Sequence, residues 1–178
     1  MNACARICAL MMAACAFSSA AAGVPKNGTL APNYVGHHID GSDALVSQYA
    51  GKVVVLTFWA TWCGVCHKEL PILERLQKVV GTDHLQIIAI NIEDKKTFRR
   101  VAQLMGTAFL ITHDEGESAS RLYARGGIPH LVLIGRDGKI IDTHIGYGED
   151  MIDPLIAQIN AALAAKPTAS VAAPGAPE

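Results

Sequence analysis

The sequence of 178 residues lacks any long run of basic residues and any alternation of basic with aromatic residues. Its formal net charge is −1, and its densest basic cluster, at residues 95–100, falls on a predicted helix, where it should form a solvated face. Nucleic-acid-binding proteins carry basic patches, so the sequence predicts no nucleic-acid partner. No internal repeat is present, and the length allows one domain with a real hydrophobic core.

The sequence also lacks an apolar run long enough to span a bilayer. Its apolar stretch near the N-terminus, residues 7–14, follows Arg6 and leads to the small residues 20–23. This order of positive charge, apolar run and small residues is typical of a secretory signal peptide. We therefore predict a signal peptide over residues 1–22 and an exported, periplasmic protein.

Cysteine is scarce in the predicted mature chain. Three of the five cysteines, Cys4, Cys8 and Cys15, lie in the predicted signal peptide, so cleavage leaves only Cys63 and Cys66. Two cysteines cannot form the disulfide framework of many small secreted domains. A bridge across two residues closes so small a loop that it adds little stability, which favours a redox role. As an alternative to cleavage after residue 22, the four residues ending at Cys15 loosely resemble a lipoprotein cleavage box, which would make Cys15 a lipid anchor.

A buried strand leads into the two remaining cysteines. The stretch at 53–59 is apolar and rich in β-branched residues, which is typical of a strand buried on both faces. Apolar residues then recur at helical spacing after Cys66, so Cys63 should lie at the strand-to-helix turn. There the free N–H groups and the helix dipole favour a thiolate. We predict that Cys63 is the attacking sulfur and that Cys66, one turn into the helix, is the resolving sulfur.

The rest of the chain predicts a mixed α/β domain. Further strands are predicted at residues 35–40 (a short edge strand), 85–92, 108–112, 131–134 and 140–145, with helices at 97–105, 117–124 and 150–163 and a brief helix within 41–52. The last two strands form a hairpin around an Asp-Gly turn. This order predicts a mixed sheet with helices on its faces. The domain should span residues 30–163, followed by a disordered, Ala/Pro-rich tail at 164–178.

These motifs resemble those of a known family. The segment Phe58-Trp-Ala-Thr-Trp-Cys-Gly-Val-Cys66, followed later by Gly127-Ile-Pro-His130, resembles the exported TlpA/ResA-like thiol-disulfide oxidoreductases of the thioredoxin superfamily. The resemblance implies a thioredoxin-like mixed β-sheet flanked by helices. It also implies a strand-helix unit inserted after the active-site helix, at residues 85–105, and no cofactor.

The resemblance further implies a function and several site residues. A Cys63–Cys66 dithiol/disulfide couple would reduce disulfides of client proteins, such as apocytochrome c or copper-site assembly proteins, with electrons from a membrane thiol donor. Trp62 would flank the site as an apolar contact for the client. Pro129 would be a cis-proline beside the cysteines, and Ile128 would present its backbone to an extended client segment.

The proton acceptor of the site is left open by the sequence. Thioredoxins carry an Asp just before the Phe-Trp pair, where this chain has Thr57. Members of the ResA-like branch instead place a carboxylate near the end of the inserted strand. The resemblance therefore implies Glu93 or Asp94 as the proton acceptor for Cys66, and the alternative is that both are exposed loop acids.

Two histidines leave other functions open. His67 completes the string Cys-Gly-Val-Cys-His, the attachment signal for c-type haem, in which His67 and a downstream Met105 or Met151 would be axial ligands. The strand-then-helix context argues against it, because haem-c domains are small and helical. His130 would lie near the sulfurs or, as the preferred alternative, hydrogen-bond to backbone at a strand start. Two thiolates with His130 would form a soft copper or zinc site, as in copper-handling relatives of this fold.

Overall fold

The computed structural model describes residues 25–106, 108–123 and 125–166. The predicted signal peptide 1–22, the alternative anchor Cys15 and most of the predicted tail lie outside the described residues. Within the described part, no helix combines the length and the apolar character needed to cross a membrane.

Seven strands form one mixed sheet in the order β2-β1-β5-β4-β3-β6-β7. The strands are β1 (Tyr34–His37), β2 (Asp43–Leu45), β3 (Val53–Trp59), β4 (Leu85–Asn91), β5 (Leu110–His113), β6 (His130–Ile134) and β7 (Ile140–Ile145). Strands β3, β4 and β5 are parallel to one another. The other four strands pair antiparallel with their neighbours, so the sheet is mixed as predicted.

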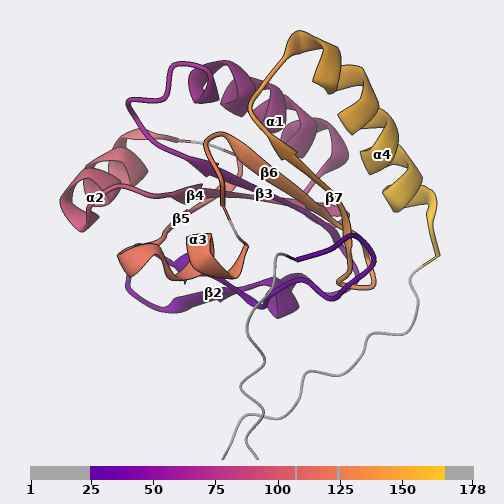
Figure 1. Ribbon diagram of the computed structural model, residues 1–178, viewed down its shortest axis with the longest axis horizontal. Helices are drawn as coiled ribbons and strands as arrows, with labels where there is room; N and C mark the ends of the chain where they lie inside the picture. Colours follow the sequence, from indigo (N-terminus) through magenta and orange to yellow (C-terminus); the bar gives the residue numbers. More distant parts are fainter. Residues whose placement is uncertain (1–24, 107, 124, 167–178) are drawn as a thin grey trace, which may run out of the picture.

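Helices cover both faces of this sheet (Figure 1). The α-helices are α1 (Cys66–Val80), α2 (Lys95–Leu104), α3 (Ser118–Leu122) and α4 (Ile152–Ala164), and the 3-10 helices are η1 (Val46–Tyr49), η2 (Glu115–Glu117) and η3 (Glu149–Met151). Residues of α1, α2 and α4 pack against one hydrophobic cluster, and residues of α3 and η1 pack against the other. The sheet is therefore the middle of three layers.

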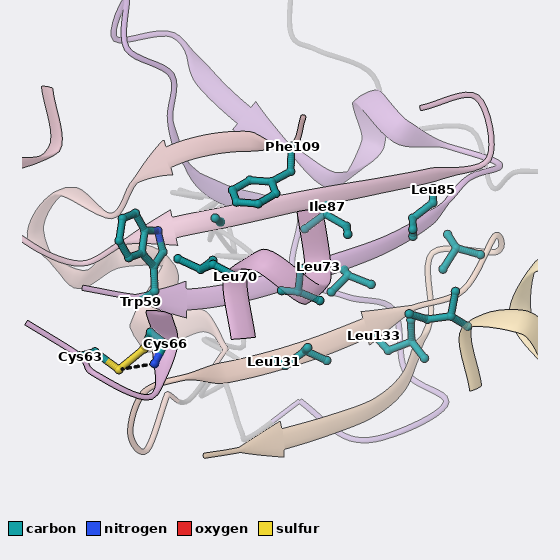
Figure 2. Packing of buried hydrophobic residues seen from close by; sticks show 14 of the residues in the cluster. Trp59, Cys63, Cys66, Leu70, Leu73, Leu85, Ile87, Phe109, Leu131 and Leu133 are labelled. Atoms are coloured by element: carbon teal, nitrogen blue, oxygen red, sulfur yellow. Dashed lines mark hydrogen bonds between the residues drawn. A yellow bond between two sulfur atoms is a disulfide. The ribbon is translucent and has the colours of Figure 1, made fainter. Parts of the chain in front are cut away.

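Strand β3 anchors the core because all seven of its residues are buried, and its six apolar residues are divided between the two clusters on opposite faces of the sheet. The cluster under α1 and α4 includes Val53, Val55, Trp59, Leu70, Leu73 and Ile159 (Figure 2). The cluster under α3 includes Val54, Leu56, Phe58, Ala119 and Tyr123. Full burial of one such large side chain stabilises a fold by about 1.5–3 kcal/mol, so burial on both faces holds β3 firmly in the centre.

Near the C-terminus of helix α1, the buried side chain of Gln77 joins the helix to strand β4. The Gln77 Nε2 group donates to the carbonyl oxygen of Leu85 at 2.7 Å, and Gln77 Oε1 accepts from the amide of Ile87 at 2.7 Å. The helix ends at Gly81, whose φ of 81° is one that glycine adopts readily. These contacts fix one end of α1, and the cysteines lie at the other.

The predicted elements agree with the structure except near one edge of the sheet. Residues 35–40 are not the edge strand, because β2 pairs outside β1 and β1 also pairs with β5. The brief helix expected within 41–52 is η1, and the residues just before it form β2. The helix expected at 117–124 is shorter, because η2 and α3 divide the segment.

Gly36 explains how β1 comes so close to β5. Its φ is 101°, and a Cβ atom at this position would lie 2.6 Å from the carbonyl oxygen of His113. Only glycine combines this backbone conformation with so close an approach. The sequence pattern gave no sign of this contact, which brings β1 and β2 onto the sheet.

Candidate active site

The two predicted cysteines meet where β3 gives way to α1. Cys63 lies in the turn of residues 60–65, Cys66 is the first residue of α1, and the two form a disulfide with Cα atoms 5.3 Å apart. Figure 2 shows the disulfide beside Trp59, at one end of the hydrophobic cluster. Trp59 is buried in that cluster. Apolar packing thus fixes the strand and the helix that carry the pair.

The surroundings of the two sulfurs are different. The backbone amide of Cys66 donates a hydrogen bond to Cys63 Sγ at 3.2 Å, whereas Cys66 itself is completely buried. Cys63 is 5% exposed. An amide donor at a helix N-terminus stabilises negative charge on the sulfur it contacts. This geometry supports Cys63 as the attacking sulfur, although the separate roles of the two cysteines stay predictions.

Exposed apolar side chains lie in the cysteine turn and beside the segment that leads to Pro129. Trp62 is 70% exposed next to Cys63, and Val65 between the cysteines is also exposed. Ile145, at the end of β7, is 59% exposed and lies against Gly127, two residues before Pro129. Sequence reasoning named Trp62 but missed Val65 and Ile145, because nothing in a local pattern indicates which apolar residues stay outside the core.

The segment after Gly127 has the backbone geometry that the family resemblance implies. The Ile128–Pro129 peptide bond is cis, and the Pro129 carbonyl accepts a hydrogen bond from the amide of Gly146 at 2.8 Å. Ile128 is partly buried and packs against both hydrophobic clusters. Client binding by Ile128 and Pro129 stays a prediction.

The two candidate proton acceptors have different partners. The Asp94 carboxylate caps α2 by accepting hydrogen bonds from the amides of Lys96 and Thr97, and bonds from Thr97 hold the pKa of Asp94 below its ordinary value. The Glu93 carboxylate instead accepts from Thr61, two residues before Cys63. Of the two acids, Glu93 is therefore the one tied to the cysteine turn, and a proton-acceptor role stays a prediction for either.

A third carboxyl group, which sequence reasoning missed, lies one helical turn from Cys66. Glu69, three residues after Cys66 in α1, is only 6% exposed and accepts a hydrogen bond from the Thr57 hydroxyl at 2.7 Å. Burial raises the pKa of Glu69 from 4.5 to about 7, and the bond from Thr57 offsets part of that rise. The available signal was a glutamate on the apolar stripe of α1, opposite the single polar residue of β3. A carboxyl that titrates near neutrality beside a redox cysteine can exchange protons with it.

Glu69 also lines an apolar pocket between α1, the end of β7 and the start of α4. The pocket is bounded by Glu69, Leu73, Leu131, His144, Tyr147 and Met151, among other residues. An apolar pocket with few polar groups is the usual form of a small binding site. Met151, one of the two candidate haem ligands, lies here, whereas Met105 lies at the C-terminal end of α2.

His67 lies close to the disulfide and hydrogen-bonds within the cysteine turn. Its Nε2 atom donates to the carbonyl oxygen of Thr61 at 2.8 Å, and its ring packs edge-on to Trp59. Both sulfurs that a c-type haem would need are joined to each other here. The geometry thus favours a redox pair over a haem attachment site.

His130 differs from both sequence expectations. Its ring packs edge-on to Phe58, on the face of the sheet opposite the cysteines, and neither ring nitrogen has a hydrogen-bond partner among the described residues. It is thus neither near the sulfurs nor bonded to backbone. Burial, with a smaller contribution from Arg125, lowers the pKa of His130 from 6.5 to about 4. Alternation along β6 explains the difference, because Leu131 rather than His130 points toward α1.

The proposed copper or zinc set is likewise not assembled. Two thiolates and His130 cannot share one ion across the sheet. In the part of the chain that the structure describes, no three His, Cys, Asp or Glu side chains form a group that could hold a metal ion.

Comparisons with known proteins agree with this geometry. A family model described as Redoxin matches residues 26–161. The chain is 32% identical to thiol-disulfide oxidoreductase ResA of Geobacillus thermodenitrificans (strain NG80-2) over 114 residues, which cover 64% of this chain and 66% of that ResA. It is 30% identical to ResA of Bacillus subtilis (strain 168) over 122 residues, 68% of each chain. The matched region thus spans about two thirds of the length of these relatives.

Solved structures give the same result. A candidate thiol:disulfide interchange protein DsbE from Chlorobium tepidum superimposes with a TM-score of 0.72 at 29% identity, covering 78% of this chain and 99% of that one. StoA from Bacillus subtilis shares the fold, with a TM-score of 0.56 at 23% identity over 68% of this chain and 95% of that one. Together with the paired cysteines at the N-terminus of α1, these matches show that the chain belongs to the TlpA/ResA-like thiol-disulfide oxidoreductases of the thioredoxin superfamily.

Proposed function

We propose that this protein is exported and reduces disulfides of client proteins by thiol–disulfide exchange. The observation that carries the proposal is the Cys63–Cys66 pair at the N-terminus of α1, flanked in the same turn by the exposed apolar side chains of Trp62 and Val65. Exposed apolar side chains beside a redox pair favour a protein partner, because they can contact the side chains that flank a client cysteine.

The exchange takes place in two balanced steps. The Cys63 thiolate attacks one sulfur of the client disulfide, a Cys63–client bond forms, and the other client sulfur leaves as a thiolate. Cys66 then loses its proton and attacks Cys63 Sγ, which forms the Cys63–Cys66 disulfide and releases the client dithiol. Two electrons pass from the enzyme to the client.

Glu69 supports the second step of this exchange. Cys66 is fully buried, so its proton needs an acceptor inside the protein, and the Glu69 carboxyl lies three residues along the same helix. With a pKa of about 7, that carboxyl is divided between its two protonation states near neutral pH. A group in this state both accepts and releases a proton at little cost.

The clients and the electron source are inferred from chemistry and from family resemblance. Apocytochrome c and copper-site assembly proteins need reduced cysteines outside the cytoplasm, and they are the proposed clients. A membrane thiol donor would reduce the Cys63–Cys66 disulfide by the same two steps in reverse. The predicted signal peptide at 1–22 supports export, and lipid attachment at Cys15 is the alternative form of the same localisation.

A trapping experiment tests this function. Cys66→Ser removes the resolving sulfur, so the mixed disulfide should accumulate and carry covalently bound client, recoverable from the periplasm under non-reducing conditions. Cys63→Ser is the matched control and should trap nothing. Equal trapping by both variants, or adducts that contain only glutathione, would rule out a protein-disulfide reductase with Cys63 as its attacking sulfur.

A second measurement fixes the direction of electron flow. The purified protein is equilibrated with reduced and oxidised glutathione, and the fraction of dithiol is read by alkylation. A reductase should have a potential well below that of an oxidising compartment. A potential above it would make this protein an oxidase or isomerase.

A further inference from the structure

Thr61 uses all of its polar groups to contact two side chains outside the turn. Its amide donates to Glu93 Oε2 at 2.6 Å, its hydroxyl donates to Glu93 Oε1 at 2.7 Å, and its carbonyl accepts from His67 Nε2 at 2.8 Å. Thr61 lies two residues before Cys63 and immediately before Trp62. Thr61 therefore connects the turn that presents the reactive sulfur to side chains outside it.

Glu93 is itself attached to the ends of two strands. The side chain of Asn91, which is fully buried at the end of β4, donates to Glu93 Oε2 at 3.1 Å and accepts from the Glu93 amide at 3.1 Å. His113, the last residue of β5, donates from Nε2 to the Glu93 carbonyl at 2.8 Å and stacks on Phe98. The Glu93 carboxylate thus connects the ends of the sheet strands to Thr61 in the cysteine turn.

His67 connects the same residue to α1. A carbonyl oxygen only accepts hydrogen bonds, so His67 Nε2 must donate to Thr61, which fixes the tautomer of the neutral ring. His67 is the second residue of α1 and follows Cys66 directly. Through Thr61, the sheet and the first turn of the helix are therefore linked without the disulfide.

We infer that Glu93 and His67 are positioning residues that keep Cys63 at the N-terminus of α1 after the disulfide opens. Reduction removes the covalent link between Cys63 and Cys66. The turn is then held by backbone bonds, such as the one from the Cys63 amide to the Ala60 carbonyl at 3.1 Å, and by the contacts of Thr61. Loss of these contacts lets the thiolate move from the amide and dipole that stabilise it. The inference rests on thiol–disulfide exchange alone, not on the choice of client.

Two substitutions of Glu93 separate positioning from charge. Glu93→Gln and Glu93→Ala both remove the negative charge, but only Gln can still bond to Thr61, because its side-chain carbonyl accepts from the Thr61 amide and its NH2 group donates to the Thr61 hydroxyl oxygen. The substrate is insulin with intact disulfides, and rates are compared at a pH where Cys63 is fully ionised. We expect Glu93→Ala to react about tenfold more slowly than Glu93→Gln.

A thiol titration adds a readout that a merely structural role would not move. The pH midpoint for iodoacetamide labelling of Cys63 should be roughly half a unit higher in Glu93→Ala than in Glu93→Gln, because the helix terminus stabilises the thiolate less. Thr61→Val should also raise the labelling midpoint of Cys63, whereas Thr61→Ser, which keeps the hydroxyl, should have the parental midpoint. Equal rates and midpoints for Glu93→Gln and Glu93→Ala would show that Glu93 acts through charge or as a proton acceptor, which overturns the inference.

Gln77→Ala is the matched control for stability. It removes two buried hydrogen bonds near the other end of α1, so it should lower the melting temperature and leave both the rate and the midpoint unchanged. Glu93→Ala combined with His67→Ala should slow exchange less than the product of the two single effects, because both act through Thr61. Multiplicative effects, or slowing by Gln77→Ala equal to that by Glu93→Ala, would also overturn it.

Discussion

Glu69 and His130 are buried ionisable residues on opposite faces of the sheet, and burial shifts the pKa of each in the direction that favours its neutral form. Neutrality of Glu69 requires a bound proton, whereas neutrality of His130 requires its loss. The two residues therefore respond to pH in opposite directions. Each response can be isolated by replacing one residue.

In the parent, Glu69 makes the free energy of unfolding fall as the pH rises, and replacing Glu69 by Gln should remove this dependence. The folded protein holds the Glu69 proton up to a pH of about 7, whereas the unfolded chain releases it near 4.5. The folded state therefore binds more protons between these values, and its stability falls as the pH rises through them, by about 3 kcal/mol. Urea unfolding of parent and Glu69→Gln from pH 4 to pH 8 measures the difference. Arg75→Gln, an exposed change in the same helix, should keep the parental slope.

Replacing His130 by Leu should have the opposite signature. The unfolded chain binds a proton at His130 below pH 6.5, but the folded protein does so only below about 4. Stability from this residue is complete above pH 6.5 and falls by about 3 kcal/mol as the pH drops to 4. Leu fills a similar volume and removes two ring nitrogens that have no hydrogen-bond partner among the described residues. The variant should therefore unfold at higher urea than the parent at pH 4.5, and a parental midpoint there would contradict this account.

Among the elements, α1 depends on Gln77 as well as on its apolar face. Gln77→Ala leaves the Leu85 carbonyl and the Ile87 amide without their buried partner. Each such group costs about 1–3 kcal/mol, so we expect the free energy of unfolding to fall by about 2–6 kcal/mol. Denaturant titration checks the value. Lys78→Ala, its exposed neighbour, should change it by less than about 0.5 kcal/mol.

Elements with a strong local pattern were predictable from the sequence. Strand β3 is a run of seven buried residues that ends just before the cysteines, so both the strand and the turn after it follow from the pattern. Strand β2 was not predictable, because three residues carry no period and are ordered by pairing with β1. The family resemblance likewise directed attention to the acids after β4, so the pairing of Thr57 with Glu69 across two elements was missed.

The whole molecule combines these opposing responses. Between pH 4.5 and 6.5, Glu69 makes stability fall with rising pH, and His130 makes it rise. The two contributions are similar in size, so these two groups together leave the stability of the parent nearly level in this range. A protein exposed to external pH would benefit from such cancellation.

Processing of the whole chain is open to direct measurement. If the predicted signal peptide is cleaved after residue 22, the mature protein begins at Gly23 and retains only Cys63 and Cys66. Intact mass and N-terminal sequencing of protein from the periplasmic fraction would give that start. An N-terminal Cys15 carrying acyl chains would identify a lipoprotein instead, and an unprocessed chain in the cytoplasm would contradict export.

The pairing of β3 with β6 has a consequence for synthesis. Val54 lies opposite Ile134 and Phe58 opposite His130. Strand β3 therefore cannot complete its pairing until β6, a much later part of the chain, has been synthesised. Until the β6–β7 hairpin emerges, one edge of β3 is open beside two reactive thiols. Non-local strand pairs of this kind form late in folding, and until they form the unpaired strand edges are prone to aggregate. Chains truncated before residue 130 should therefore aggregate through this open edge and form intermolecular disulfides in an oxidising compartment, whereas β6 covers the edge in the complete protein.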